Sequence, residues 1–177
     1  MVSLTALFWV LVVLFAIIGA MRGWAKEILV AFSVILALFL INLLETYVPI
    51  LKIDSQISTT TRLWIRLSIV GFLTFFGYQS SNLRLLAGTR FAREKFQDAL
   101  LGFILGALNG YLIFGTIWFF LDFANYPYDF IIPPNPDTAA GQAALELLSK
   151  MPPAYLVPPW IYFAVAIAFL FVVVVFI

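Results

Sequence analysis

The sequence contains no cysteine and no histidine among its 177 residues. Disulfides, thiol chemistry, the usual zinc sites and histidine-ligated haem or copper are therefore excluded within this chain, and we expect no cofactor. Charge is also scarce, since 11% of the residues are charged and the net charge is +1. Nucleic-acid binding requires a concentrated basic face. This composition does not supply one, so we expect no nucleic-acid partner.

Long apolar runs are what the sequence has instead. Hydrophobic residues make up 64% of the chain and the mean hydropathy is +1.07, both above what a soluble surface tolerates. The few charges cluster between uncharged stretches that are long enough to cross a hydrocarbon layer of about 30 Å as helices. The sequence therefore predicts an all-α integral membrane protein, a polytopic bundle of four to five transmembrane helices.

Four spans and a fifth follow from the uncharged stretches. They are Leu4–Ala20, Ile28–Leu44, Leu63–Leu83, Ala99–Leu121 and residues 160–177. We interpret the first as a retained span and not as a signal peptide, because the first charges, Arg22 and Lys26, follow it. Arg66 lies one turn inside the third span and is expected to snorkel to the surface. The uncharged tail suggests a natural chain that continues past Ile177.

The predicted domain organisation is a four-helix membrane core over residues 1–122, a proline-rich loop over 123–159 and the fifth span over 160–177. The loop contains eight prolines, Pro127, Pro133, Pro134, Pro136, Pro152, Pro153, Pro158 and Pro159. Inside it, Asp137–Ser149 predicts a short helix that Asp137 or Thr138 caps. Its apolar side would consist of Ala140, Ala143, Ala144, Leu147 and Leu148, and we expect that side to lie against the membrane surface.

The distribution of lysine and arginine predicts the orientation in the membrane. One set of alternate loops holds six of these residues, Arg22, Lys26, Arg84, Arg90, Arg93 and Lys95. The opposite side holds four, Lys52, Arg62, Arg66 and Lys150. By the positive-inside rule the first set is cytoplasmic. The N-terminus and the proline-rich loop are then extracytoplasmic.

A row of glycines marks the fourth predicted span. Gly102, Gly106 and Gly110 recur every fourth residue, so they share one helix face and allow a neighbouring backbone to approach closely. Asn109 lies on or beside that face, where an unpaired amide would be costly. We expect it to bond to a partner helix through Ser68, Thr74 or Asn42. Substrate binding by Asn109 is the alternative.

The first hairpin carries charges near its turn. Arg22 and Lys26 are one helical turn apart and are expected to bind lipid phosphates at the inner headgroups. Glu27 is a candidate for an ion pair that would tie the two cytoplasmic hairpins together. Its candidate partners are Arg84, Arg90 and Arg93. The alternative for those arginines is a lipid-facing amphipathic surface.

Two stretches carry a resemblance to a known family. The first, Gly19-Ala-Met-Arg-Gly23-Trp-Ala-Lys-Glu27, and the second, Asp98 to Gly110 running on to Asp122, resemble the colicin V production protein (CvpA) family of small bacterial inner-membrane proteins. The resemblance covers roughly residues 4–122, with Gly19 and Gly23 as further packing glycines. The chain departs from the family where Ala99 and Asn109 replace frequent arginines, and in its fifth span.

The resemblance implies a role in colicin V production or export and in envelope homeostasis, without an established reaction. We find no nucleophile and base pair, phosphate-binding glycine loop or metal-ligand cluster, and no acidic residue in the middle of a predicted span. We therefore expect no enzyme, and a channel or transporter is the least favoured function. The alternative is an accessory structural subunit of a larger membrane complex. Expected partners are the lipid bilayer and other membrane subunits or a second copy.

Overall fold

The computed structural model describes residues 3–52, 56–79 and 95–176, and all regular structure in these ranges is helical. The elements are α1 (Leu4–Arg22), α2 (Trp24–Tyr47), η1 (Pro49–Leu51), α3 (Thr59–Gln79), α4 (Lys95–Phe123), α5 (Ala139–Leu148), α6 (Pro152–Tyr155) and α7 (Trp160–Phe176). The predicted all-α class is therefore confirmed for the described residues.

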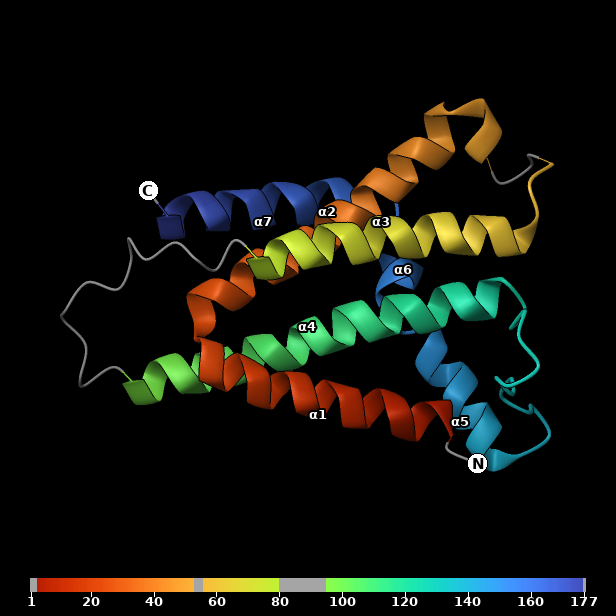
Figure 1. Cartoon of the computed structure of the whole chain (residues 1–177), viewed down its shortest axis with the longest axis horizontal. Coiled ribbons are helices and arrows are strands. Elements are labelled where there is room, and N and C mark those ends of the chain that lie inside the picture. Colours follow the sequence, from red (N-terminus) through yellow and green to blue (C-terminus); the bar gives the residue numbers. More distant parts are fainter. Residues whose placement is uncertain (1–2, 53–55, 80–94, 177) are drawn as a thin grey trace.

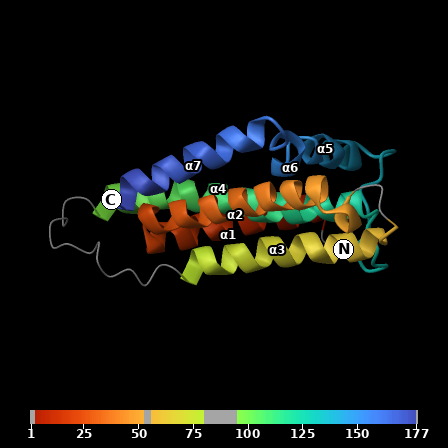
Figure 2. The ribbon, with the colours of Figure 1, turned by 90° about the horizontal axis from the view of Figure 1, so that it is seen from above.

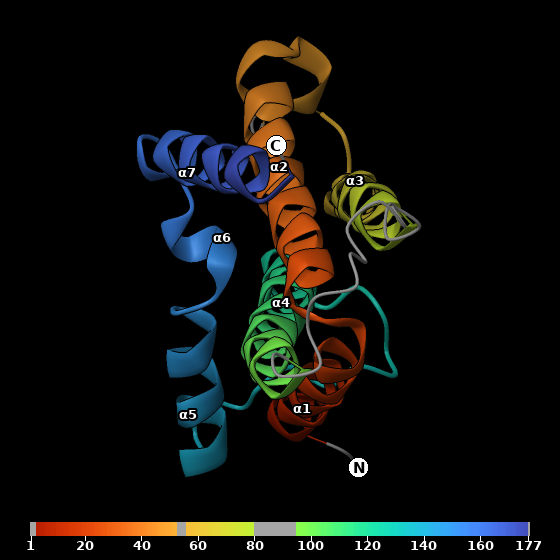
Figure 3. The ribbon, with the colours of Figure 1, turned by 90° about the vertical axis from the view of Figure 1, so that its left-hand side faces the viewer.

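The long helices lie lengthwise beside one another (Figure 1). Seen end-on, α1, α4 and α2 form a central column, with α5, α6 and α7 along one flank and α3 on the other side (Figure 3). Figure 2 likewise shows α3 and α7 on opposite sides of α2. α1 packs chiefly against α4, whereas α2 contacts α3, α4 and α7. α4 and α2 are thus the helices around which the others assemble.

Three of the helices, α1, α2 and α4, are long and apolar enough to cross a membrane. α7 is apolar over Trp160–Val174 but shorter. α3 has 21 residues, yet Arg62, Arg66 and several hydroxyl side chains make it less apolar than those three helices, and it does not join them. The bundle is therefore consistent with a membrane protein, and the count of four to five spans stays a prediction.

The helices extend beyond the apolar stretches that predicted them. α2 begins at Trp24, four residues before the predicted Ile28, and α4 begins at Lys95. An uncharged run locates the part of a helix that lipid requires, but the backbone hydrogen bonds continue through flanking charges. As a result Glu27, placed outside the predicted second span, lies within the first turn of α2.

The short helix of the loop is α5, which Thr138 caps through a bond from the Gly141 N–H to its hydroxyl (3.1 Å). On the side expected to face the membrane, Ala140 and Ala143 are exposed, and contact of this side with the membrane surface stays a prediction. The buried residues are Gly141, Ala144 and Leu148. Ala144 and Leu148 pack in one cluster with Phe8 of α1 and Trp118 of α4. α5 therefore covers the flank of the bundle with its Gly141 face.

Candidate functional site at the junction of four helices

Glycines on α1 and α4 bring these two helices into backbone contact. A Cβ added at Gly19 would lie 2.7 Å from the Cα of Gly106, and one added at Gly106 would lie 2.9 Å from the Cα of Gly19. A Cβ at Gly102 would lie 3.1 Å from the Gly19 carbonyl carbon, and one at Gly110 would lie 2.9 Å from the Cα of Val12. Backbone atoms cannot rotate aside as a side chain can. Only glycine fits at these positions. We name this contact of α1 with α4, at Gly19, Gly102, Gly106 and Gly110, the glycine seam.

Gly23 makes the turn between α1 and α2. Its φ of +87° lies in the region that glycine adopts without steric cost. α2 has no side-chain cap of its own. Asp98 in the first turn of α4 supplies one instead, because the Trp24 N–H donates to its Oδ1 at 3.1 Å. A carboxylate at this end also suits the positive end of the helix dipole. Beside the glycine seam, this cap therefore also joins the hairpin of α1 and α2 to α4.

A polar junction lies beside this turn. Glu27 is fully buried, and its Oε1 accepts a hydrogen bond at 2.5 Å from Nη1 of Arg22. Asn109 of α4, also fully buried, donates from Nδ2 to Glu27 Oε2 at 2.8 Å and to the Glu27 carbonyl at 2.9 Å. Arg22 further donates to the carbonyl of Tyr78 at 3.3 Å and lies 4.2 Å from the centre of its ring. One carboxylate thus links α1, α2, α3 and α4.

The local sequence explains why these charges meet. Arg22 is in the last turn of α1 and Glu27 is in the first turn of α2, with Gly23 reversing the chain between them. A cation at a helix C-terminus and an anion at a helix N-terminus are each favoured by the helix dipole. Arg22 also serves the last turn of α3 through the Tyr78 carbonyl. The charged groups of the junction therefore come from, or bond to, the ends of three helices, α1, α2 and α3.

The structure bears on two expectations about this junction. Asn109 bonds to Glu27, and not to Ser68, Thr74 or Asn42. Arg22 points inward and pairs with Glu27, with 19% of its side chain exposed, and binding of lipid phosphate by Arg22 stays a prediction. Lys26 is exposed. Arg84, Arg90 and Arg93 lie outside the described residues.

Some buried polar atoms in the described ranges have no hydrogen-bond partner. They are Oδ1 of Asn109 and the hydroxyl oxygens of Thr74 and Thr116. No group of histidine, cysteine or carboxylate side chains that could hold a metal ion occurs in the part of the chain that the structure describes. The junction can therefore join helices through charge and hydrogen bonds, and its Asn109 amide keeps one free acceptor.

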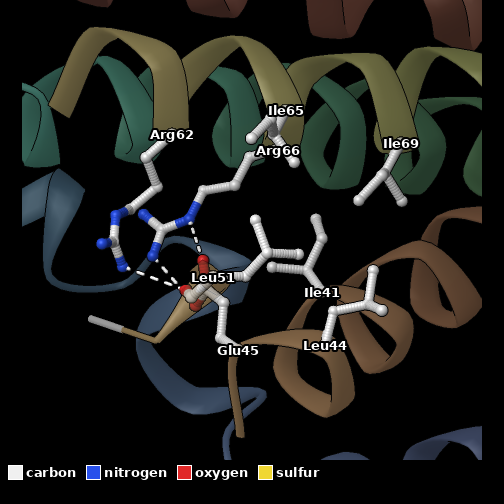
Figure 4. A pocket seen from close by; sticks show the side chains of 8 residues that line it. All are labelled: Ile41, Leu44, Glu45, Leu51, Arg62, Ile65, Arg66 and Ile69. Carbon is white, nitrogen blue, oxygen red and sulfur yellow. Dashed lines mark hydrogen bonds and ion pairs between the residues drawn. The ribbon is translucent and has the colours of Figure 1, made fainter. Parts of the chain in front are cut away.

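A second ion pair lies at the other end of α2 (Figure 4). Glu45 accepts from Arg66 Nε at 2.7 Å and from its Nη2 at 3.0 Å. Arg66 is buried and stacks near Phe120 and Phe123, at 4.9 and 4.5 Å from the ring centres. The expectation that Arg66 snorkels to the surface was therefore wrong, because a carboxylate one helix away neutralises it. Arg62 donates beside it to the Lys52 carbonyl at 2.8 Å.

The pocket around this pair is small. Its lining comes from α2, η1 and α3, namely Ile41, Leu44, Glu45, Leu51, Arg62, Ile65, Arg66 and Ile69. The cavity volume is about 10 Å³, which is room for roughly one water molecule. Glu45 follows Glu27 by 18 residues, about five helical turns, so the two carboxylates share one face of α2. Arg66 thus ties α3 directly to Glu45 of α2, and Arg22, paired with Glu27 of α2, bonds to the other end of α3.

Sequence reasoning missed Asp98, Tyr78 and the Glu45–Arg66 pair as contact residues. Glu45 and Arg66 are opposite charges next to predicted spans, and such charges usually pair. That signal was present in the sequence. The bond from Trp24 to Asp98 carried no local signal, because the two residues are far apart in the chain.

The described residues form an all-helical bundle in which three helices are long and apolar enough to cross a membrane. Residues 4–134 match the Colicin V production protein family, so the chain belongs to this family. The match includes α1 to α4 and ends before α5. No curated protein and no solved structure matches the chain.

Proposed function

We propose that the chain is a multi-pass protein of the bacterial inner membrane that acts in secretion or envelope homeostasis as a non-catalytic helical scaffold. The observation that carries this proposal is the family match over residues 4–134. The contacts of the bundle support the scaffold part. The charged pairs of α2 are directed at neighbouring helices, and the pocket beside Glu45 is too small for a solute.

The test is deletion of the gene in its bacterial host, followed by measurement of protein export and of survival under detergent and osmotic stress. We expect the deletion to impair export or survival and the parent gene to restore it. Export and survival equal to the parent strain in all conditions would count against the proposal. Solute flux into vesicles that contain only this chain would count against the scaffold and favour transport.

The alternative function is an accessory subunit of a larger membrane complex. The observation that favours it is the apolar surface of α7, which packs chiefly on α2 and leaves Phe163, Ile167 and Leu170 more than half exposed. Such a surface can face lipid or another protein. Purification in a mild detergent distinguishes the two. A partner present in fixed stoichiometry supports the subunit, and a chain that purifies alone argues against it.

The orientation belongs to the same proposal, with the N-terminus and the proline-rich loop extracytoplasmic. Six lysines and arginines against four support it. Because the chain has no cysteine, single cysteines at Ala92 and Ala140 can be labelled with an impermeant reagent on intact cells. We expect Ala140→Cys to react and Ala92→Cys to react only after the membrane is opened. Reaction of both positions on intact cells would refute this topology.

A further inference from the structure

The chain reverses direction immediately after α4. Asn125 and Tyr126 have φ values of 54° and 49°, a region that a bulky side chain such as tyrosine seldom adopts. The Tyr126 N–H donates to the Leu121 carbonyl at 3.0 Å, and the indole of Trp118 donates to the Tyr126 hydroxyl at 3.1 Å. Trp118 lies five residues before the end of α4. These bonds hold the start of the connection against the last turns of α4.

The returning chain forms a tight turn that we name the aromatic turn, residues Tyr128–Ile132. The Ile131 N–H donates to the Tyr128 carbonyl at 3.0 Å. The Tyr128 ring lies edge-on to Trp64 of α3 at 6.5 Å and is stacked with Phe130 at 5.4 Å. Figure 3 shows the connection looping out on the side of α3 and α1 before it crosses to α5.

The aromatic turn is apolar but uncovered within the described chain. Phe130 is 81% exposed and Ile132 is 53% exposed. Tyr128 connects these residues to Trp64 of α3, which is 56% exposed. The patch is therefore continuous from a helix of the bundle into the loop.

We propose that the aromatic turn inserts into the headgroup region of the lipid bilayer. Its position indicates this partner, because the turn begins five residues after a helix able to span the membrane, and the chain reversal holds it at that level. Tryptophan and tyrosine concentrate at membrane interfaces, where their rings contact acyl chains and their polar atoms contact headgroups. Asp129 is exposed within the turn, so the insertion is shallow.

Insertion of the aromatic turn would divide the proline-rich loop into two parts. The first part of the loop would be a membrane anchor beside α3, and only the part nearer α5 would be surrounded by water. An anchor here would steady α3, which is less apolar than α1, α2 and α4. Neither the family match nor the proposed function requires such a contact.

The test places a single environment-sensitive fluorophore, NBD, at Phe130→Cys in the cysteine-free chain. The labelled protein is inserted into nanodiscs of phosphatidylethanolamine and phosphatidylglycerol, which leave both faces accessible. Quenching is measured with headgroup spin-labelled lipid and, separately, with iodide in the buffer. The control is Asp137→Cys, an exposed position nearer α5.

We expect lipid quenching at Phe130→Cys to exceed that at Asp137→Cys about threefold, with the opposite order for iodide. Ile132→Cys should give the same quenching pattern as Phe130→Cys. Agreement of the two positions would show that the result does not depend on one substitution. Equal access of iodide to positions 130 and 137 would place the turn in water and overturn the proposal. Protection of position 130 from both quenchers would mean that protein covers the turn, which also overturns it.

Discussion

A Gly106→Leu variant is expected to insert into the membrane but to lose the packing of α1 on α4. A Cβ at this position already meets the Phe15 carbonyl oxygen, with the Cα and N of Gly19 at 2.9 and 3.1 Å. All of these are backbone atoms, so the two helices must separate along the whole seam. Overpacking of this kind costs about 3 kcal/mol. Thermal unfolding in detergent should show a markedly lower Tm than the parent chain.

Gly71→Leu is the matched control, because a Cβ at Gly71 of α3 meets no atom within 4 Å. The same change of residue at that exposed helical position should leave Tm unchanged or raise it slightly, since leucine is the better helix former. If Gly106→Leu keeps the parent Tm, or if both variants lose the same stability, the close contact of α1 and α4 does not hold the fold.

The helices could be predicted from the sequence because an uncharged run of about 20 residues has one stable state in lipid, a helix that satisfies its own backbone. The Gly102, Gly106 and Gly110 row likewise predicted a face of close approach. The family resemblance named Gly19 as a further packing glycine, but nothing in the sequence paired Gly19 with this row, because nearly every residue of α1 is apolar. Glycine spacing indicates that a helix face can be approached closely, but it does not identify the helix that packs there.

The partners of the charged residues in the polar junction could not be predicted from their positions in the sequence. From the sequence, Arg22 was expected to bind lipid headgroups and Glu27 to pair with an arginine of the other hairpin, because both residues lie in the link between the first two predicted spans. Gly23 instead turns α2 back so sharply that the five-residue separation of Arg22 and Glu27 becomes a 2.5 Å contact. Asn109 meets them from a helix 82 residues further along the chain. Such a contact depends on how α2 and α4 pack, which no local pattern encodes.

Glu27→Gln is expected to destabilise the bundle strongly, because Glu27 is fully buried and pairs with Arg22. Glutamine keeps the size of the side chain and an acceptor for Asn109, so any loss reflects the missing negative charge. Arg22 would then be left mostly buried beside a neutral group, which costs roughly 3 kcal/mol when one partner of a buried pair is removed. The Arg22 contact with Tyr78 should weaken with it, loosening the end of α3. The measurement is the Tm in detergent.

The paired variant, Arg22→Met with Glu27→Met, separates charge from general damage. Replacing both partners with apolar side chains removes the unpaired charge, so it should recover much of the stability that Glu27→Gln loses. Glu146→Gln is the matched surface control. Lys150 holds the pKa of the Glu146 carboxyl below its usual range through a 2.7 Å ion pair, yet both side chains are well exposed. Water screens such a pair, so its loss should not change Tm measurably. If Glu27→Gln also leaves Tm unchanged, Glu27 does not hold the four helices together.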